Sequence, residues 1–192
     1  ALQGASSGSA DATHLNTMNL VTAKTKLFIA CYADGDDNTL TTINRTWVTS
    51  SSYYMTIFTP TNTSTECNTN QRHDGTAAGG GYTMNSTTGT ATKSNVGVGP
   101  NYTKVLGLKI KKNSSNATDA AGIATNWTLF NAGTPSIGCE IACNLLIQES
   151  GGDAGWLIQW NGVDNTRSYG TSIHDNIMIS RSSTLNYGLH LE

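Results

Sequence analysis

One sequence pattern occurs twice in the C-terminal part of this 192-residue chain and limits what the chain can fold into. Residues 141–160 read IACNLLIQESGGDAGWLIQW, and residues 173–192 read IHDNIMISRSSTLNYGLHLE. Both copies place an isoleucine, an asparagine and alternating aliphatic residues in the same order, followed by a polar loop and a second strand-like segment. A repeat of roughly 20–50 residues with strands and no helical pattern is typical of a solenoid.

The alignment of the repeats also indicates where the chain turns between strands. Asn144 matches Asn176, and extending the alignment backward through VLGLKIKK places Gly107 at the same position. Glycine and asparagine tolerate the left-handed backbone conformation better than other residues do. We therefore predict that Gly107, Asn144 and Asn176 stack in successive coils as a one-residue corner with positive φ, where asparagine side chains can form a ladder.

These features predict an all-β fold, a parallel β-helix in which each coil stacks on the previous one around an aliphatic core. A β-sandwich whose strands resemble one another by accident is the alternative. Residues 11–24 carry Leu15, Met18 and Val21 at helical spacing, so we expect a short helix that caps the open edge of the first coil. We expect residues 1–10 to be a flexible segment and residues 11–192 to be a single β-helix domain.

The first half of the chain resembles a known class of proteins. The resemblance is carried by residues 31–60 (CYADGDDNTLTTINRTWVTSSSYYMTIFTP), QRHDG at 71–75, YTM at 82–84 and NYTKVLGLKI at 101–110. Together they resemble the N-terminal coils of bacterial secreted right-handed parallel β-helix proteins of the pectin-lyase-like class. The resemblance implies a right-handed coil. It implies no particular activity, because some such proteins are adhesive or structural and others cleave polysaccharides with catalytic motifs that cannot be placed on this chain.

Composition is typical of a secreted surface protein. Only 12% of the residues are charged, about half the usual share of a soluble domain. The net charge of -2 provides no electrostatic attraction for nucleic acid. No apolar run approaches the length of a membrane span. We therefore predict an extracellular or cell-surface protein that binds no nucleic acid and has no membrane span.

Asn-x-Ser/Thr triplets are frequent, and either chance in an Asn- and Thr-rich chain or N-glycosylation explains them. If the chain is glycosylated, Asn62, Asn113 and Asn116 are the expected carriers, because sugars need exposed loops.

The four cysteines are compatible with an oxidising compartment and equally with free thiols. Cys139 and Cys143 would lie about 13 Å apart in a fully extended chain, beyond disulfide reach. They could pair only if the chain bends between them. The other two are Cys31 and Cys67.

Three tryptophans, Trp127, Trp156 and Trp160, are candidates for contact with a carbohydrate or a partner protein. Trp127 and Trp160 share one register in the alignment, so we expect them to stack along the axis. If they face outward, they form a flat aromatic strip that suits sugar rings. If they face inward, they belong to the core, which is the more common place for tryptophan.

Polar segments offer weaker candidates. DGDDN at 34–38 begins like a calcium loop, but Thr39 stands in place of the turn glycine and Arg45 in place of the bidentate glutamate. We predict an acidic surface turn there and a surface loop for RHDG at 72–75. The His-Asp pair at 174–175 precedes the corner, and its direction is open. No motif for a metal or a cofactor is present, so we predict neither.

Two classes of function follow. We favour a non-catalytic extracellular β-helix module, structural or adhesive, for which a subunit of a self-assembling surface appendage or filament is one form. The alternative is a lyase or hydrolase acting on acidic polysaccharide. Such an enzyme needs a groove lined with carboxylates or basic residues, and the repeating strands of the second half contain few of either.

The alignment also bears on partners. Glu192 falls in the register of Gln159, one residue before the position of Trp160. A coil that ends in this way leaves backbone groups and the rim of the core unpaired. We therefore expect the domain to be incomplete or covered by another subunit in head-to-tail self-association. A polysaccharide is the other expected partner.

Overall fold

A computed structural model of the chain describes most of its residues, in segments separated by gaps. The described ranges are 17–43, 46–88, 94–114, 121–125, 137–150, 156–160, 170–181 and 187–191. The predicted flexible segment at 1–10 lies outside them.

The structure is built from three parallel sheets of five strands each. Sheet 1 contains β1 (Leu27–Ala30), β4 (Met55–Phe58), β7 (Thr103–Leu106), β10 (Glu140–Ala142) and β13 (Ser172–His174). Sheet 2 contains β2 (Asp36–Asp37), β5 (Thr83–Thr88), β8 (Lys109–Ser114), β11 (Leu145–Ser150) and β14 (Ile177–Ser180). Sheet 3 contains β3 (Thr41–Ile43), β6 (Val96–Val98), β9 (Ala121–Thr125), β12 (Trp156–Trp160) and β15 (Tyr187–Leu191).

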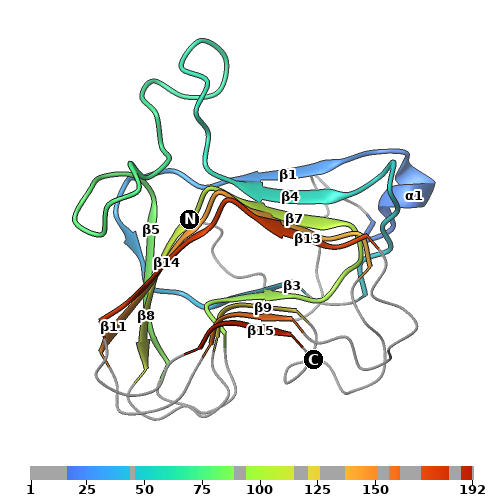
Figure 1. Cartoon of the computed structure of the whole chain (residues 1–192). Helices are drawn as coiled ribbons and strands as arrows, with labels where there is room; N and C mark the ends of the chain where they lie inside the picture. Colours follow the sequence, from blue (N-terminus) through green and yellow to red (C-terminus); the bar gives the residue numbers. More distant parts are fainter. Residues whose placement is uncertain are drawn as a thin grey trace.

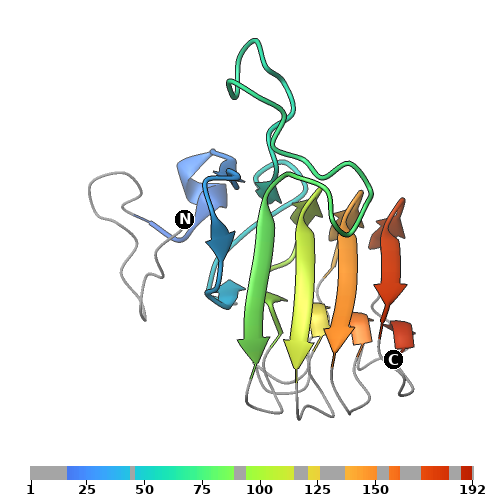
Figure 2. The same cartoon turned by 90° about the vertical axis from the view of Figure 1, so that its left-hand side faces the viewer.

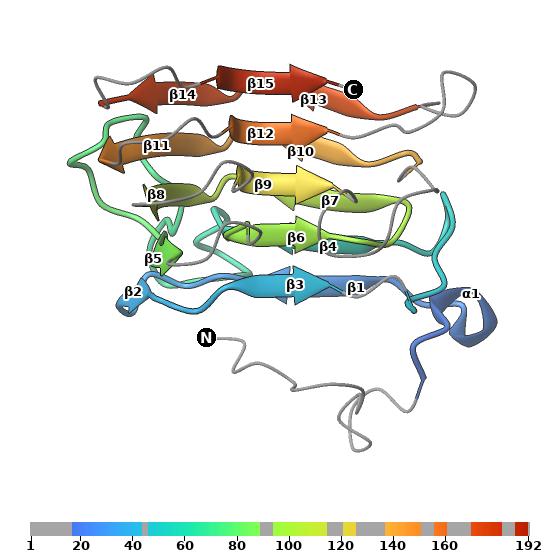
Figure 3. The same cartoon turned by 90° about the horizontal axis from the view of Figure 1, so that it is seen from below.

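The chain passes from sheet 1 to sheet 2 to sheet 3 and then begins the next coil in sheet 1 (Figure 1). Viewed from the side, each coil stacks on the previous one, with β1, β2 and β3 at one end and β13, β14 and β15 at the other (Figure 3). This is the predicted right-handed parallel β-helix, and the β-sandwich alternative is wrong.

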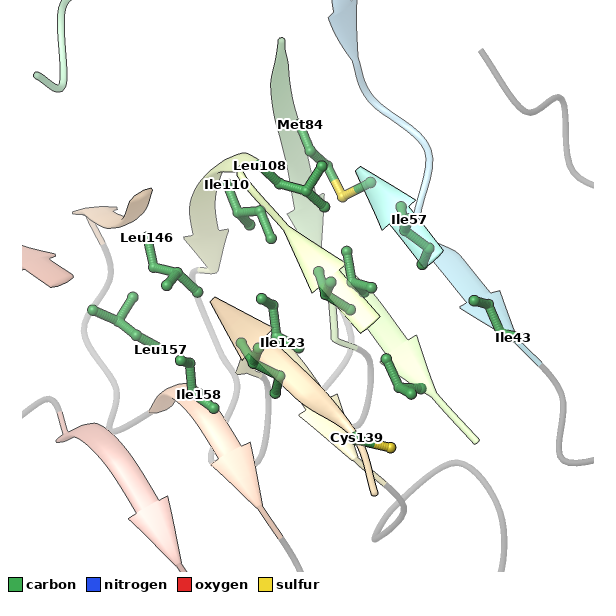
Figure 4. Packing of buried hydrophobic residues seen from close by; sticks show 14 of the residues in the cluster. Ile43, Ile57, Met84, Leu108, Ile110, Ile123, Cys139, Leu146, Leu157 and Ile158 are labelled. Carbon is green, nitrogen blue, oxygen red and sulfur yellow. The ribbon is translucent and has the colours of Figure 1, made fainter. Parts of the chain in front are cut away.

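The core fills the space between the three sheets. Because side chains alternate along a strand, every second residue points inward and meets the same position of the next coil. In sheet 1 one such column contains Ile57, Val105 and Ile141, all buried. Figure 4 shows Met84, Ile110 and Leu146 of sheet 2 directed toward it. Each fully buried aliphatic side chain contributes about 1.5–3 kcal/mol.

The predicted helix is much shorter than residues 11–24. α1 covers only Leu20–Ala23, with Asn19 as its N-cap. The buried residue is Leu20, whereas Val21 is exposed and residues 11–16 lie outside the described ranges. The helix cannot begin earlier because Asn19 forms a parallel bridge with Val48.

The corner between sheets 1 and 2 is shifted by one residue from the prediction. Ala142 pairs with Leu106, and Leu145 pairs with Lys109, so the residue beside Gly107 in the next coil is Cys143. The positive φ angles are at Gly107 (75°), Cys143 (58°) and Asp175 (54°). Asn144 and Asn176 do not have positive φ and come one position later. The predicted register failed because apolar residues at 145–147 obscure the alternation of this strand.

The asparagines do form the predicted ladder. The Nδ2 group of Asn144 donates to Asn176 Oδ1 at 2.9 Å and to the Val105 carbonyl at 3.0 Å. Its Oδ1 accepts from the Leu108 backbone N–H at 2.9 Å. Asn176 repeats the arrangement one coil later, accepting from the Asn144 backbone N–H and donating to the Ile141 carbonyl. Each asparagine thus bonds its coil to the previous one where the ladder of the strands is interrupted.

We predict that Asn144→Ala lowers the free energy of unfolding by about 2–4 kcal/mol, because it leaves several buried polar groups without partners. Asn85→Ala is the matched control. Within the described residues the Asn85 side chain donates to the exposed Asp36 carboxylate, so its loss should cost less than about 1 kcal/mol. Urea denaturation measures both, and equal effects would contradict the role of the ladder.

Lys112 is an anomaly of this core. It lies in β8 between Ser86 and Gln148 of the neighbouring coils and is only 1% exposed. Its ammonium has no hydrogen-bond partner within the described structure. Burial lowers the pKa of Lys112 to about 8. A buried charge without a partner destabilises the folded state.

We predict that Lys112→Met raises the free energy of unfolding by about 1–3 kcal/mol at pH 7. Because the folded-state pKa of Lys112 is depressed, the wild type recovers this loss as pH rises from about 8 toward the unfolded pKa of about 10.4. The advantage of the variant should therefore shrink over that range. Lys111→Met, on the outward side of the same strand, is the control. A destabilised Lys112→Met protein, or an advantage independent of pH, would disprove this account.

Candidate functional site

The outer face of sheet 1 gathers polar and aromatic side chains from all five coils. Since Ile57, Val105 and Ile141 point inward, the alternate residues point outward. One outward column contains Phe28, Thr56, Lys104, Glu140 and Ser172, and the next contains Ala30, Phe58, Leu106, Ala142 and His174. In Figure 1 this sheet forms the upper side of the coil, from β1 to β13. This outer face is the candidate site.

A connected charge network occupies the later coils of the face. Lys104 Nζ lies 2.6 Å from Glu140 Oε2, and His174 Nε2 lies 3.4 Å from Glu140 Oε1. On its other side, His174 Nδ1 lies 2.8 Å from Asp175 Oδ2. Glu140 is therefore held between two basic groups, and His174 is held between two carboxylates. The Asp175 side chain is 76% exposed and is accessible to a ligand.

The two central groups respond oppositely to this arrangement. The hydrogen bond from Lys104 lowers the pKa of Glu140, with His174 adding to the effect. The hydrogen bond to Asp175 raises the pKa of His174, with Glu140 adding to it. The network therefore favours the charged form of each side chain.

Aromatic rings and lysines occupy the earlier coils of the same face. The Phe28 ring makes edge contacts with Tyr54 and Phe58, with centroids 6.4 and 6.3 Å apart. Lys26 Nζ and Lys104 Nζ lie 4.8 and 5.3 Å from the centroid of the Tyr54 ring. Phe28 is 57% exposed. Lys104 joins the aromatic group to the charge network.

The insertion between β4 and β5, residues 59–82, stands at one edge of this face. Figure 2 shows its outer loop projecting beyond the coils. The Tyr32 hydroxyl donates to the Glu66 carbonyl at 3.0 Å, and the Gln71 side chain accepts from the Ala33 backbone N–H at 2.7 Å. These bonds attach the insertion to the first coil.

The electrostatics of Glu140 do not suit one catalytic role, that of a general acid. A general acid that cleaves a glycosidic bond needs a raised carboxyl pKa, whereas the pKa of Glu140 is lowered. Lys104 is already engaged by Glu140. Among the described residues, no group of His, Cys, Asp and Glu is arranged to hold a metal ion.

The predicted aromatic strip is wrong in its register. Trp160 pairs with Thr125 of β9 and with Leu191 of β15, so it does not align with Trp127, which lies outside the described residues. Trp156 pairs with Ala121 and is half-buried. The pairing of Trp160 with Leu191 also corrects the register predicted for Glu192.

The glycosylation candidates are placed differently from one another. Asn62 is exposed in the insertion, where its Oδ1 accepts from the Ser64 backbone N–H at 2.9 Å. Asn113 lies within strand β8 and pairs with Thr87, so its predicted loop position is wrong. Asn116 lies outside the described residues.

The cysteines are all free thiols. Cys139 is buried, and Cys31, Cys67 and Cys143 are partly buried. Burial raises the pKa of Cys139 and of Cys31 to about 11, which makes both thiols poor nucleophiles.

The predicted acidic turn at 34–38 is only partly a surface feature. Asp36 is exposed in β2, but Asp37 is half-buried and accepts a hydrogen bond from the Tyr82 hydroxyl at 3.0 Å. Both residues line a cavity of about 110 Å³ at the N-terminal end of the core, together with Cys31 and several aliphatic side chains.

Sequence reasoning missed the principal residues of the outer face. It noted only the His-Asp pair at 174–175 and left its direction open. Lys104 and Glu140 occur as opposite charges one coil apart, which is the signal that would have found them. That signal depends on the correct register.

Neither a family model, nor a curated protein, nor a solved structure matches this chain significantly. The resemblance to the pectin-lyase-like class therefore remains a prediction. The single helix in the described part of the chain has four residues, and no described helix is long and apolar enough to cross a membrane.

We predict that the imidazole of His174 titrates above the usual histidine pKa of about 6.5. Asp175→Asn should lower this pKa more than Glu140→Gln does, because the bond to Asp175 is the larger cause of the shift. Because the folded-state pKa of His174 is raised, the bonds to its charged imidazole stabilise the folded protein fully below the unfolded-state pKa. This stabilisation is lost as pH rises through the folded-state pKa. NMR titration of the imidazole carbons measures it. A pKa unchanged in both variants would contradict the network.

Proposed function

We propose that this protein is a non-catalytic adhesive module of the cell surface or extracellular space that binds polysaccharide. The outer face of sheet 1 is the proposed binding surface. The observation that carries the proposal is the continuity of the face: an exposed aromatic group and a charge network meet at Lys104.

Both halves of the face suit sugar recognition. Aromatic rings present apolar area to the C–H groups of a sugar ring, and Phe28 is the most exposed ring of the group. Paired carboxylates and ammonium groups keep unused acceptor and donor positions that can bind hydroxyls. Asp175 and Lys26 are exposed at opposite ends of the face, so a chain of several sugar units is better matched than a single sugar.

The arrangement along the axis supports an extended ligand. Successive strands of a sheet are about 4.8 Å apart, so the outward columns repeat a contact once per coil. The insertion at one edge gives the face a side wall (Figure 2). The lowered pKa of Glu140 does not suit the general acid of a glycoside hydrolase, which supports a binding role over hydrolysis.

A glycan array followed by isothermal titration calorimetry tests the proposal. We expect at least one polysaccharide to bind and Phe28→Ala to weaken binding about tenfold, equivalent to about 1.4 kcal/mol. Val48→Ala is the matched control, since Val48 is 48% exposed but lies beside α1. Circular dichroism confirms that each variant is folded.

Three results would count against the proposal. Absence of binding across neutral and acidic polysaccharides would refute the adhesive role. Equal losses in Phe28→Ala and Val48→Ala would remove the outer face of sheet 1 from it. Release of reducing ends or unsaturated sugars would favour the alternative, a polysaccharide lyase or hydrolase.

Head-to-tail self-association stays a separate prediction. Its support is Leu189 of the last described coil, which pairs with the buried core residue Ile158 but is itself 42% exposed. Exposed apolar side chains beside unpaired strand edges favour association with further strands. Light scattering coupled to size-exclusion chromatography reports it.

A further inference from the structure

The second half of the insertion, residues 71–82, forms a strap that crosses several coils. Its two ends are held together, since the Gln71 N–H donates to the Pro60 carbonyl at 2.9 Å and the Gln71 carbonyl accepts from the Tyr82 N–H at 2.7 Å. Figure 2 shows the strap passing from β5 over the starts of β8 and β11. It leaves the second coil and reaches side chains of the fifth.

His73 fastens the strap to the corner. Its Nε2 lies 2.9 Å from the Cys143 carbonyl, and its Nδ1 lies 3.1 Å from the Gly75 backbone nitrogen. A carbonyl can only accept and a backbone N–H can only donate. Nε2 must therefore carry the proton, and Nδ1 must be unprotonated. Only the neutral imidazole satisfies both bonds.

The surroundings of His73 disfavour its charged form. Desolvation is the main cause that lowers the pKa of His73. The bond to the Cys143 carbonyl opposes it and raises the pKa, Arg72 and Lys109 lower it further, and Asp74 raises it, with a net shift downward. At the corner, the His73 ring faces the Cys143 backbone. Asp175 occupies the same corner position as Cys143 in the next coil. Asp74 itself accepts from the backbone N–H and the hydroxyl of Thr76.

The strap runs along one outward column of sheet 2. Lys109, Leu145 and Ile177 occupy one register position in successive coils. Lys109 Nζ donates to the Gly79 carbonyl, and Gly75 lies against the Ile177 side chain. Leu145 lies between these two contacts and is fully buried, although it points away from the core.

We propose that residues 74–82 of the strap are a pH-operated cover: they are closed over the outer face of sheet 2 while His73 is neutral, and they detach when His73 is protonated, while His73 itself stays bonded to the Cys143 carbonyl. Protonation places an N–H on Nδ1 opposite the Gly75 N–H, so this bond is lost. Opening uncovers Leu145 and frees Lys109 from Gly79. The proposal concerns sheet 2 and does not depend on polysaccharide binding at sheet 1.

The direction of the pH effect follows from the depressed pKa. A histidine that folds neutral stabilises the closed state fully above its unfolded pKa of about 6.5. That stabilisation is lost as pH falls below this value toward the folded-state pKa. The cover is therefore closed at neutral pH and opens in acid.

Hydrogen exchange followed by NMR on the full chain tests the proposal at pH 7.5 and pH 5. We expect the protection factor of the Gly75 amide to be at least tenfold lower at pH 5 than at pH 7.5, after correction for intrinsic exchange. The Leu145 amide, which bonds to the Leu108 carbonyl in the core ladder, should keep its protection. Binding of the dye ANS should rise in parallel, because apolar surface becomes exposed.

Two variants identify the histidine responsible. His73→Gln retains a side-chain N–H for the Cys143 carbonyl and is not protonated at pH 5, so its ANS binding should not rise in acid. His174→Gln, which leaves the strap intact, should open as the wild type does. An imidazole pKa of His73 at or above the usual value, or unchanged Gly75 protection once His73 is charged, would overturn the proposal. Equal loss of protection at Gly75 and Leu145 would also overturn it, because the whole domain would then be unfolding.

Discussion

The side-chain amides of Asn144 and Asn176 hold the coils in register at the corner where the strand ladders are interrupted. Each amide accepts from one backbone N–H and donates to one carbonyl of the previous coil. In a solenoid the strands of each coil pair only with those of the neighbouring coils, so a register error in a strand is local. The ladder fixes the register at the corner, and the columns of sheets 1 and 2 on either side follow from it.

The proposed binding face depends on that register. Glu140 meets Lys104 and His174 only because β10 pairs with β7 and β13 without a shift. A slip of one residue would turn every outward side chain of a strand inward. The positive φ angles at Gly107 and Cys143 set the turn that leads from this face to sheet 2, where the strap is fastened to the Cys143 carbonyl.

The fold could be predicted from the sequence because a repeated strand pattern has few solutions, and the match of Asn144 with Asn176 is visible in the letters alone. The residue that lies beside Gly107 in the next coil could not be identified, because consecutive aliphatic residues at 145–147 fit two registers equally well. The candidate site was lost for the same reason: in the predicted register Lys104 falls opposite Ile141 instead of Glu140. The role of His73 could not be foreseen either, because its partner Cys143 belongs to a coil far along the chain.

The exchange rate of the Asn144 side-chain amide protons, measured by NMR, tests the central claim most directly. The account predicts strong protection, because both Nδ2 protons are bonded in the interior, to Asn176 and Val105. The side-chain amide of Asn85, bonded to an exposed aspartate, provides the comparison within the same molecule. Exchange of the Asn144 side chain as fast as that of Asn85 would contradict the ladder, and with it the register on which the proposed binding face depends.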